Sequence, residues 1–361
     1  MSSSRKFYIG LLTVSSGLAC SGMAQAQSSV TLYGTADAGL IYTNKTLNMT
    51  TLQNAGKQFG FTDSGLSASR FGMYGTEDLG GGLRAEFRLE SGYDTGTGGF
   101  NDSNGYLFGR QAYVGLKGGF GEVKAGLQYS PFADELDALD PRGLSQFASS
   151  LIINSDNLIA ASWFVPNAVS YTSPVLWGFQ AAAMVSLGGV AGDFRNGFQY
   201  SGSLKYTNGT VMVSASFFEA QPSTGSALVT PVPTQFPVEV EGRQLGASYK
   251  IGRLTAKVSF VNYKVGSTSN NVYGGGLNFL VTTQLDLNGG VWYEQQSRVA
   301  QNHSLLVGLG TNYYLSRTTT VYVQAGLVNN CGTMDTGLSI DTPLGATGTT
   351  LGLDFGIRHV F

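Results

Sequence analysis

Several residue types are scarce in this chain of 361 residues. It has only two cysteines, and charged residues make up 12%, about half the roughly 25% typical of soluble domains. Lysine and arginine total 21 against 23 aspartates and glutamates, so there is no basic surplus for a nucleic-acid partner. Beyond the N-terminal segment no run of 18 apolar residues occurs, which excludes a transmembrane helix. Long stretches of helical periodicity are also missing, which argues against an ordinary α/β enzyme.

Sequence motifs for catalysis or metal binding are missing too. The chain has no G-x-S-x-G, no Walker A sequence, no H-E-x-x-H and no C-x-x-C. Its two histidines, His303 and His359, lie near the ends of apparent strands. The sequence therefore predicts neither an enzyme nor a bound cofactor or metal.

The first 26 residues have the features of a cleaved secretory signal peptide. Arg5 and Lys6 precede a largely apolar stretch from Phe7 to Ala19, and the segment ends in Ala24-Gln25-Ala26. We expect residues 1–26 to be removed and residues 27–361 to form one β-barrel domain. Only Cys331 would then remain, which excludes an internal disulfide.

From residue 27 onward, segments of about ten residues alternate between apolar and polar side chains. In one of them Leu83, Ala85 and Phe87 alternate with Arg84, Glu86 and Arg88. A period of two gives a strand one apolar and one polar face. Sixteen such segments are expected, with fourteen or eighteen as open alternatives: 29–42, 67–78, 82–93, 107–118, 121–130, 166–174, 178–187, 197–207, 209–219, 241–250, 253–264, 270–281, 284–295, 302–315, 317–328 and 348–361.

The connections between these segments alternate in length. Short turns such as Gly80-Gly81-Gly82 and Asn208-Gly209 separate links as long as 43–66, 131–165 and 329–347. Short turns at one end and long loops at the other are typical of transmembrane β-barrels. In hydrocarbon an open sheet edge leaves backbone groups unsatisfied, so only a closed barrel can span a bilayer with strands. We therefore expect the apolar faces to contact lipid and the polar faces, rich in small residues, to line a water-filled lumen.

The link 131–165 is too long for a plain loop and carries four carboxylates: Asp134, Glu135, Asp137 and Asp140. It either folds into the lumen or lies outside as a solvated loop, and its spacing favours neither. Alternation places Arg84, Arg88 and Lys124 on the polar face, and Arg70 with them. Arg110 has the parity of lipid-facing residues, unless a bulge intervenes or the residue lies at the rim. Charged side chains of both signs across a lumen would set ion selectivity.

Several motifs resemble those of the general porins of Gram-negative, notably β-proteobacterial, outer membranes. They are Ser28-Ser29-Val30-Thr31-Leu32-Tyr33-Gly34, Ser69-Arg70-Phe71-Gly72, Gly75-Thr76-Glu77-Asp78-Leu79-Gly80-Gly81-Gly82-Leu83, Phe108-Gly109-Arg110-Gln111-Ala112-Tyr113-Val114-Gly115-Leu116, Phe120-Gly121-Glu122-Val123 and the terminal Gly356-Ile357-Arg358-His359-Val360-Phe361.

This resemblance implies an all-β fold: a 16-stranded antiparallel transmembrane barrel, assembled as a homotrimer, with a long third loop folded into each lumen. It implies that Arg70 and Arg110 match wall arginines near the constriction. It also implies that Phe361 is the terminal aromatic residue by which the barrel-assembly machinery recognises its clients.

Together these features predict an outer-membrane channel for passive diffusion of ions and small hydrophilic solutes, with lipid and the assembly machinery as its other partners. A substrate-specific channel would need an aromatic ladder in the pore, for which Tyr74, Trp163 and Trp292 are the candidates. A plugged barrel acting as an adhesin or structural protein is the remaining alternative. The expected constriction has a basic wall of Arg70, Arg84, Arg88, Arg110 and Lys124 facing the loop acids Asp134, Glu135, Asp137 and Asp140.

Overall fold

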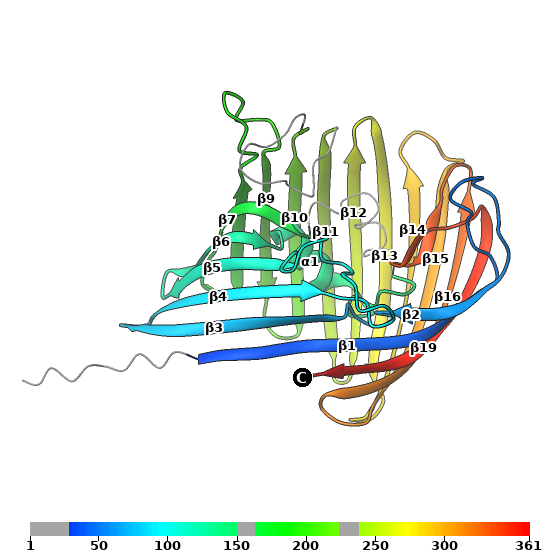
Figure 1. Cartoon of the computed structure of the whole chain (residues 1–361), viewed down its shortest axis with the longest axis horizontal. Coiled ribbons are helices and arrows are strands. Elements are labelled where there is room, and N and C mark those ends of the chain that lie inside the picture. The colour runs from blue at the N-terminus through cyan, green and yellow to red at the C-terminus, as the bar shows by residue number, and fades with distance from the viewer. Residues whose placement is uncertain (1–28, 150–162, 224–237) are drawn as a thin grey trace, which may run out of the picture.

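A computed structural model describes residues 29–149, 163–223 and 238–361 of the chain. The expected signal peptide lies outside these described residues. No helix in the described part is long and apolar enough to cross a membrane. The chain forms one large antiparallel sheet that curves round and closes on itself (Figure 1).

The barrel strands, in chain order, are β1 (Ser29–Thr43), β2 (Gln58–Asp63), β3 (Arg70–Gly80), β4 (Leu83–Gly92), β5 (Gln111–Gly118), β6 (Gly121–Gln128), β7 (Val165–Thr172), β8 (Phe179–Ser186), β9 (Gln199–Thr207), β10 (Val211–Ala220), β11 (Val240–Ile251), β12 (Leu254–Val265), β13 (Thr268–Leu280), β14 (Leu285–Gln296), β15 (His303–Tyr314), β16 (Thr319–Cys331) and β19 (Gly348–Val360). One helix, α1 (Pro131–Leu139), and a small hairpin, β17 (Thr336–Ser339) and β18 (Thr342–Leu344), complete the described elements.

These seventeen strands occupy sixteen positions around the barrel. β2 and β3 share one position, because residues 38–43 of β1 pair with β2 and residues 29–35 pair with β3. The barrel closes where β1 pairs with β19. The predicted sixteen-stranded barrel is confirmed, and counts of fourteen and eighteen are excluded.

The predicted boundaries need five corrections. The link 43–66 contains β2, and the strand expected at 67–78 begins only at Arg70, since residues 64–69 leave the wall and fold inward. The strand expected from residue 107 begins at Gln111, the link 131–165 opens with helix α1, and the link 329–347 contains the β17–β18 hairpin. Each difference falls in or beside a long connection, where alternation along a strand gives no information.

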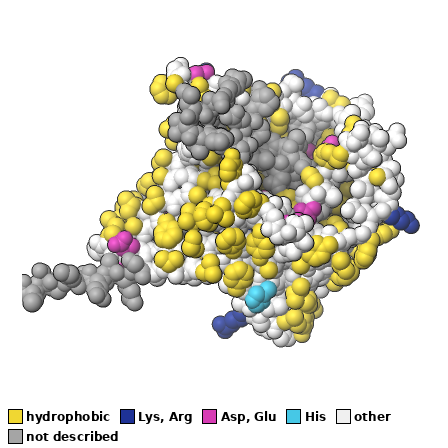
Figure 2. Space-filling view, in the orientation of Figure 1, with side chains coloured by type: hydrophobic (Ala, Val, Ile, Leu, Met, Phe, Trp, Pro, Cys, Tyr) yellow, Lys and Arg dark blue, Asp and Glu magenta, His cyan; other side chains and the backbone are white. Residues whose placement is uncertain are grey.

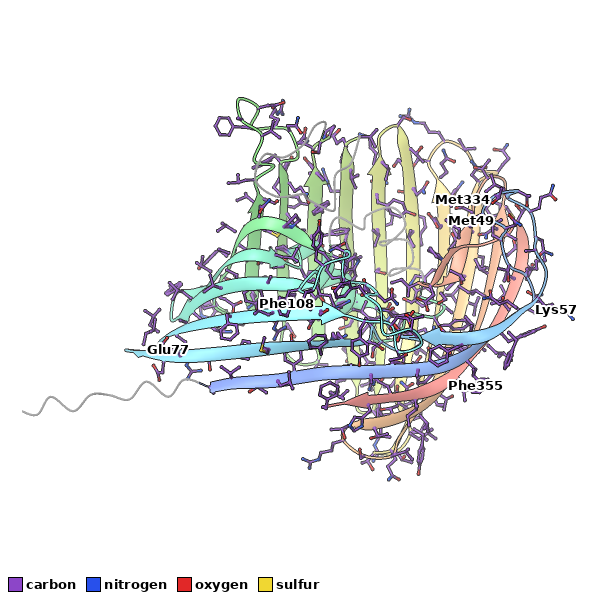
Figure 3. All side chains as sticks on the ribbon, viewed as in Figure 1. Met49, Lys57, Glu77, Phe108, Met334 and Phe355 are labelled. Atoms are coloured by element: carbon purple, nitrogen blue, oxygen red, sulfur yellow. The ribbon has the colours of Figure 1, made fainter. Side chains whose placement is uncertain are left out.

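The asymmetry of the connections is present as predicted. The β3–β4 turn is made by Gly80, Gly81 and Gly82, whose φ angles of 85°, 63° and 81° suit glycine. Figure 3 places Glu77 near this turn at one end of the barrel, and Met49, Lys57 and Met334 toward the other. By the rule for outer-membrane barrels, the short-turn end is the periplasmic one.

Apolar side chains cover the outside of the wall. Leu351, Leu353 and Phe355 of β19 are exposed, whereas the alternating Thr350 and Asp354 are buried toward the interior. Figure 2 shows apolar side chains spread over the face of the barrel that is toward the viewer, with few charges among them. This is the inverse of a soluble sandwich and suits lipid contact.

The interior is less polar than alternation predicts. Several inward-facing side chains are apolar and fully buried, and they form a cluster with the loop residues Phe147 and Leu338. The inward members from the strands include Val240, Val272, Trp292, Leu306 and Val328. The hydrophobic core of this protein therefore lies inside the barrel, against chain that folds inward.

Candidate functional site: the lumen cavity

The chain from Tyr129 to Ser149 folds into the lumen, and we call it the inward segment. It begins with α1, whose N-terminus is capped by Ser130: its hydroxyl accepts a bond from the Ala133 amide at 3.1 Å, and Pro131 occupies the first turn. Serine followed by proline is a favourable helix start. That signal was available at Ser130-Pro131 and would have predicted the helix.

Inward-facing glycines of the barrel wall leave space for the side chains and backbone of the inward segment. A Cβ on Gly242 or Gly246 would meet the Phe132 ring or the Leu139 side chain at 2.7 Å and 2.3 Å. A Cβ on Gly308 would lie 2.2 Å from the Ala148 carbonyl oxygen. Part of the small-residue content of the polar face therefore serves close packing of the segment rather than contact with water.

Arg142 fastens the far end of the inward segment to the wall. Its guanidinium donates to the Phe147 and Ala148 carbonyls at 2.5 Å and 2.8 Å, and to the side chains of Asn288 at 3.2 Å and Gln324 at 2.5 Å. Burial lowers the pKa of Arg142 to about 10, so it keeps its charge at neutral pH. Arg142 could not be predicted as a site residue, because nothing in its Pro-Arg-Gly setting marks it as buried.

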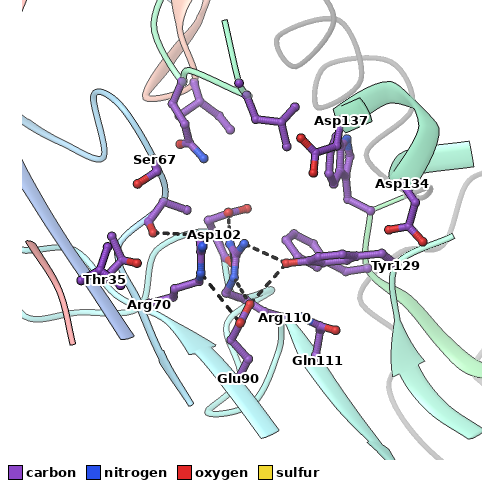
Figure 4. Close-up of a pocket in the computed structure, with 18 of the residues that line it drawn as sticks. Thr35, Ser67, Arg70, Glu90, Asp102, Arg110, Gln111, Tyr129, Asp134 and Asp137 are labelled. Carbon is purple, nitrogen blue, oxygen red and sulfur yellow. Dashed lines mark hydrogen bonds and ion pairs between the residues drawn. The ribbon is translucent and has the colours of Figure 1, made fainter. Parts of the chain in front are cut away.

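A cavity of about 420 Å³ lies between the inward segment and the wall (Figure 4). Its charged lining residues among those described are four arginines and four carboxylates. They are Arg70, Arg88, Arg110, Arg358, Glu90, Asp102, Asp134 and Asp137.

Five of the nine predicted pore residues line this cavity: Arg70, Arg88, Arg110, Asp134 and Asp137. In Figure 4, Asp134 and Asp137 extend from the helix toward a space whose other side is formed by Arg70 and Glu90. Because 134 and 137 are three apart, they share one helical face.

The other four predicted pore residues lie elsewhere. Glu135 is buried in an ion pair with Lys205 at 3.0 Å, and Asp140 is buried between the Ser149 hydroxyl and the Arg142 amide. Arg84 is exposed and pairs in register with Lys117, toward the short-turn end. Lys124 lies 3.7 Å from Glu122 and over the Tyr113 ring. Strand parity fixes the face of a residue but not its height in the barrel, which explains the difference for Arg84 and Lys124.

Arg110 points inward. Its amide donates to the Glu90 carbonyl at 3.2 Å although Glu90 pairs in register with Gln111, so the ladder is irregular here and strand parity does not extend to Arg110. Its side chain is 7% exposed and bonds to Glu90 at 2.8 Å, to the Tyr129 hydroxyl at 2.9 Å and to Asp102. Burial alone would lower the pKa of Arg110, but Asp102, Tyr129 and Glu90 outweigh it and hold the pKa above its usual value.

Arg70 and Arg88 are more available. Arg70 is 33% exposed, and its Nε lies 3.8 Å from Glu90. The Arg88 guanidinium lies 5.5 Å and 5.4 Å from the ring centres of Tyr33 and Tyr74, and among the described residues no carboxylate oxygen lies within 4.0 Å of its nitrogens. Two tyrosines thus hold a cation in place without neutralising it.

Several cavity residues were not predicted from the sequence, among them the charged Glu90, Asp102 and Arg358 and the tyrosine Tyr129. Arg358 has the same parity as Asp354 in the last strand, which could have placed it on the polar face. Asp102 and Tyr129 come from connections, where alternation gives no information. Of the three candidates for an aromatic ladder, Trp163 lines the cavity, Tyr74 packs on Arg88, and Trp292 is buried over the glycines of β13 and β14.

A sequence model of one family, described as Gram-negative porin, matches residues 12–333. This chain belongs to the Gram-negative porin family. The porin is 29% identical to outer membrane porin protein 32 of Delftia acidovorans, over 95% of this chain and 97% of that protein. It is 27% identical to an outer membrane porin protein of Bordetella pertussis, over 94% and 96% of the two chains.

Solved structures agree. An anion-selective porin from Comamonas acidovorans has a TM-score of 0.76 and 26% identity, covering 93% of this chain and 100% of that one. OmpT of Vibrio cholerae, in a structure described as the trimer form, shares the fold at 18% identity and a TM-score of 0.66. The protein is thus an outer-membrane porin, a barrel for passive diffusion, and the predicted family, fold, function and location are confirmed.

Proposed function

We propose that this porin prefers anions over cations and that the cavity lined by Arg70, Arg88, Asp134 and Asp137 sets the preference. The observation that carries the proposal is the unequal pairing of the charges that line the cavity. Glu90 and Asp102 are held by Arg110. That leaves Arg70, Arg88 and Arg358 facing two loop carboxylates. The anion-selective porin of Comamonas acidovorans is a relative that supports the same sign.

The proposal is tested in a planar bilayer with a KCl gradient. We expect long-lived open channels whose reversal potential has the sign of chloride preference. Heat-denatured protein serves as the control for insertion. A reversal potential of potassium sign would overturn the preference, and folded, inserted protein without conductance would overturn the open channel.

Acidification is expected to strengthen the anion preference. Asp134 and Asp137 are exposed to the cavity, but the cavity lies inside the barrel, and the limited access of bulk water raises the pKa of each to about 6. Neighbouring cations limit the rise: Lys124 and Lys205 act on Asp134, and Lys257 and Arg70 act on Asp137, while Glu135 and Asp140 oppose them. As the pH falls through 6 the two carboxylates take up protons, so the lumen loses up to two negative charges.

An ion passing at about 10 Å from the two carboxylates, in water, feels a change in electrostatic potential when they lose their charges. This change should raise the chloride-to-potassium permeability ratio about two- to fourfold. The measurement is the reversal potential at pH 7.5 and at pH 5. The double variant Asp134→Asn, Asp137→Asn is the matched control, and its reversal potential should be nearly independent of pH in this range. A wild-type ratio that stays constant or falls would contradict the assignment.

We propose further that the porin assembles as a homotrimer, as the trimer form of the Vibrio cholerae protein supports. Conductance steps in groups of three would accompany trimer formation.

We also propose that residues 1–26 are a cleaved signal peptide. Phe361, which is 51% exposed at the end of the last strand, is proposed to be the residue that the barrel-assembly machinery recognises. The proposal includes no catalytic step and no cofactor.

A further inference from the structure

The lumen cavity has an apolar side that charge selection does not require. Besides its arginines, it is lined by Leu144, Ile340, Trp163 and Phe164. Leu144, Ile340 and Trp163 are only partly buried, so each presents apolar surface to the lumen. A channel for water and salt gains nothing from such surface, because it favours neither ions nor their hydration.

Leu144 adopts a backbone conformation that disfavours it. Its φ is 58°, in the left-handed region, which costs an L-residue with a Cβ about 1–2 kcal/mol. Glycine or asparagine would occupy this conformation at lower cost. The leucine side chain does not recover the cost through full burial, since it stays half-buried at the cavity. Strain of this kind at a site where ligands pass is characteristic of functional positions.

The hairpin β17–β18 holds a second apolar group beside Leu144. The Ile340 amide donates to the Gln146 carbonyl at 3.0 Å, and the Ala148 amide donates to the Leu338 carbonyl at 2.6 Å. Phe147 and Ser339 form the β-bridge between these two bonds. Backbone pairing therefore fixes the Ile340 side chain next to the inward segment, and both line the same cavity.

Aromatic rings and cations complete the lining. Trp163 packs edge-on against Tyr129, with ring centres 5.9 Å apart, and Phe164 lies under the Arg110 guanidinium at 5.2 Å. Arg70, Arg88 and Arg358 line the same space. A carboxylate with an apolar ring could thus meet cations and apolar surface at once.

We propose that this cavity selects, among small anions, carboxylates that carry an apolar ring-sized body, with benzoate as their simplest representative. The inference rests on the proposed anion preference and names the class of solute that the cavity favours. The arginines attract the carboxylate, and Leu144, Ile340 and Trp163 take the place of water around the ring. A polar carboxylate such as gluconate has the same charge but gains nothing from these side chains.

The test compares benzoate with gluconate. Reversal potentials with each sodium salt opposite sodium chloride give the permeability of both anions relative to chloride. We expect benzoate to exceed gluconate in wild-type protein by more than the ratio of their diffusion rates in water. Leu144→Gly should reduce the benzoate-to-gluconate ratio about threefold, because partial burial of the leucine side chain is lost.

Leu144→Gly also separates this effect from misfolding. It relieves the left-handed strain, so the barrel should be at least as stable as wild type while its benzoate preference falls. Ile340→Ser should lower the ratio as well. Met334→Ser is the matched control and should leave the ratio unchanged. Met334, labelled in Figure 3, lies in the same connection as Ile340 but is not one of the residues that line the cavity.

The outcomes separate the two proposals. A chloride-selective channel whose benzoate-to-gluconate ratio equals that of free diffusion, or does not respond to Leu144→Gly, overturns the solute class and leaves the anion preference standing. A channel without chloride preference overturns the proposed function itself, and this is visible in potassium chloride before any benzoate is added.

Discussion

Replacing Arg142 with methionine is expected to release the inward segment and raise the single-channel conductance. The change removes the donors for the Phe147, Ala148 and Leu309 carbonyls and for the Asn288 and Gln324 side chains. The Ser145 hydroxyl still donates to the Phe147 carbonyl and to Gln324, but the Ala148 carbonyl and Asn288 lose their donor. A buried acceptor left unpaired costs about 1–3 kcal/mol, so the far end of the segment is held less tightly to the wall. The barrel ladder is unaffected, and the strands should remain folded.

Conductance in a planar bilayer and protease cleavage within the segment measure this release. Arg253→Met is the matched control, because Arg253 is exposed at a short turn and its conductance should equal that of wild type. Gly308→Val should also release the segment and raise the conductance, without changing any charge. A Cβ at position 308 would lie too close to the Ala148 carbonyl oxygen for the segment to stay in place. Its own control is Gly60→Val, where no heavy atom lies within 4 Å. Wild-type conductance from folded Arg142→Met protein would show that other contacts hold the segment.

The barrel could be predicted from sequence because its signal is local. Each strand repeats apolar and polar positions, and a one-residue slip would move every side chain to the wrong face. The closing pair β1–β19 and the short glycine turns follow from that pattern and from the resemblance of the terminal motifs. The break between β2 and β3 could not be predicted from the sequence. It depends on Asp37, whose carboxylate accepts hydrogen bonds from the Leu66 and Ser67 amides inside the lumen.

The cavity was only half predictable, for a different reason. Face can be read from parity, which placed Arg70 and Arg88 inward, but depth along the barrel depends on strand tilt and stagger. Arg84 and Arg88 share a face, yet only Arg88 lines the cavity. For the acids, the prediction lacked the helix. In an irregular loop nothing distinguishes Asp134 and Asp137 from Glu135 and Asp140, whereas in a helix residues 134 and 137 lie on the same face.

Two arginines of equal charge are expected to respond differently to the same substitution. Arg110→Met removes the partner of Glu90 and Asp102 and leaves buried charge uncompensated, which typically costs about 3–5 kcal/mol. Arg88→Met loses two contacts with tyrosine rings, worth about 1 kcal/mol or less each at a partly exposed site. Urea unfolding in lipid vesicles should therefore show a large loss for Arg110→Met and a small one for Arg88→Met.

The electrical effect of the two substitutions should be similar, because each removes one positive charge from the lining. Both variants are expected to move the reversal potential toward potassium preference. Adding Glu90→Gln to Arg110→Met restores the charge balance and removes one stranded carboxylate, so it should recover part of both the stability and the chloride preference. If Arg88→Met destabilised the barrel as much as Arg110→Met, Arg88 would be part of the packed wall. If Arg88→Met left the reversal potential unchanged, its charge would not reach the permeating ions.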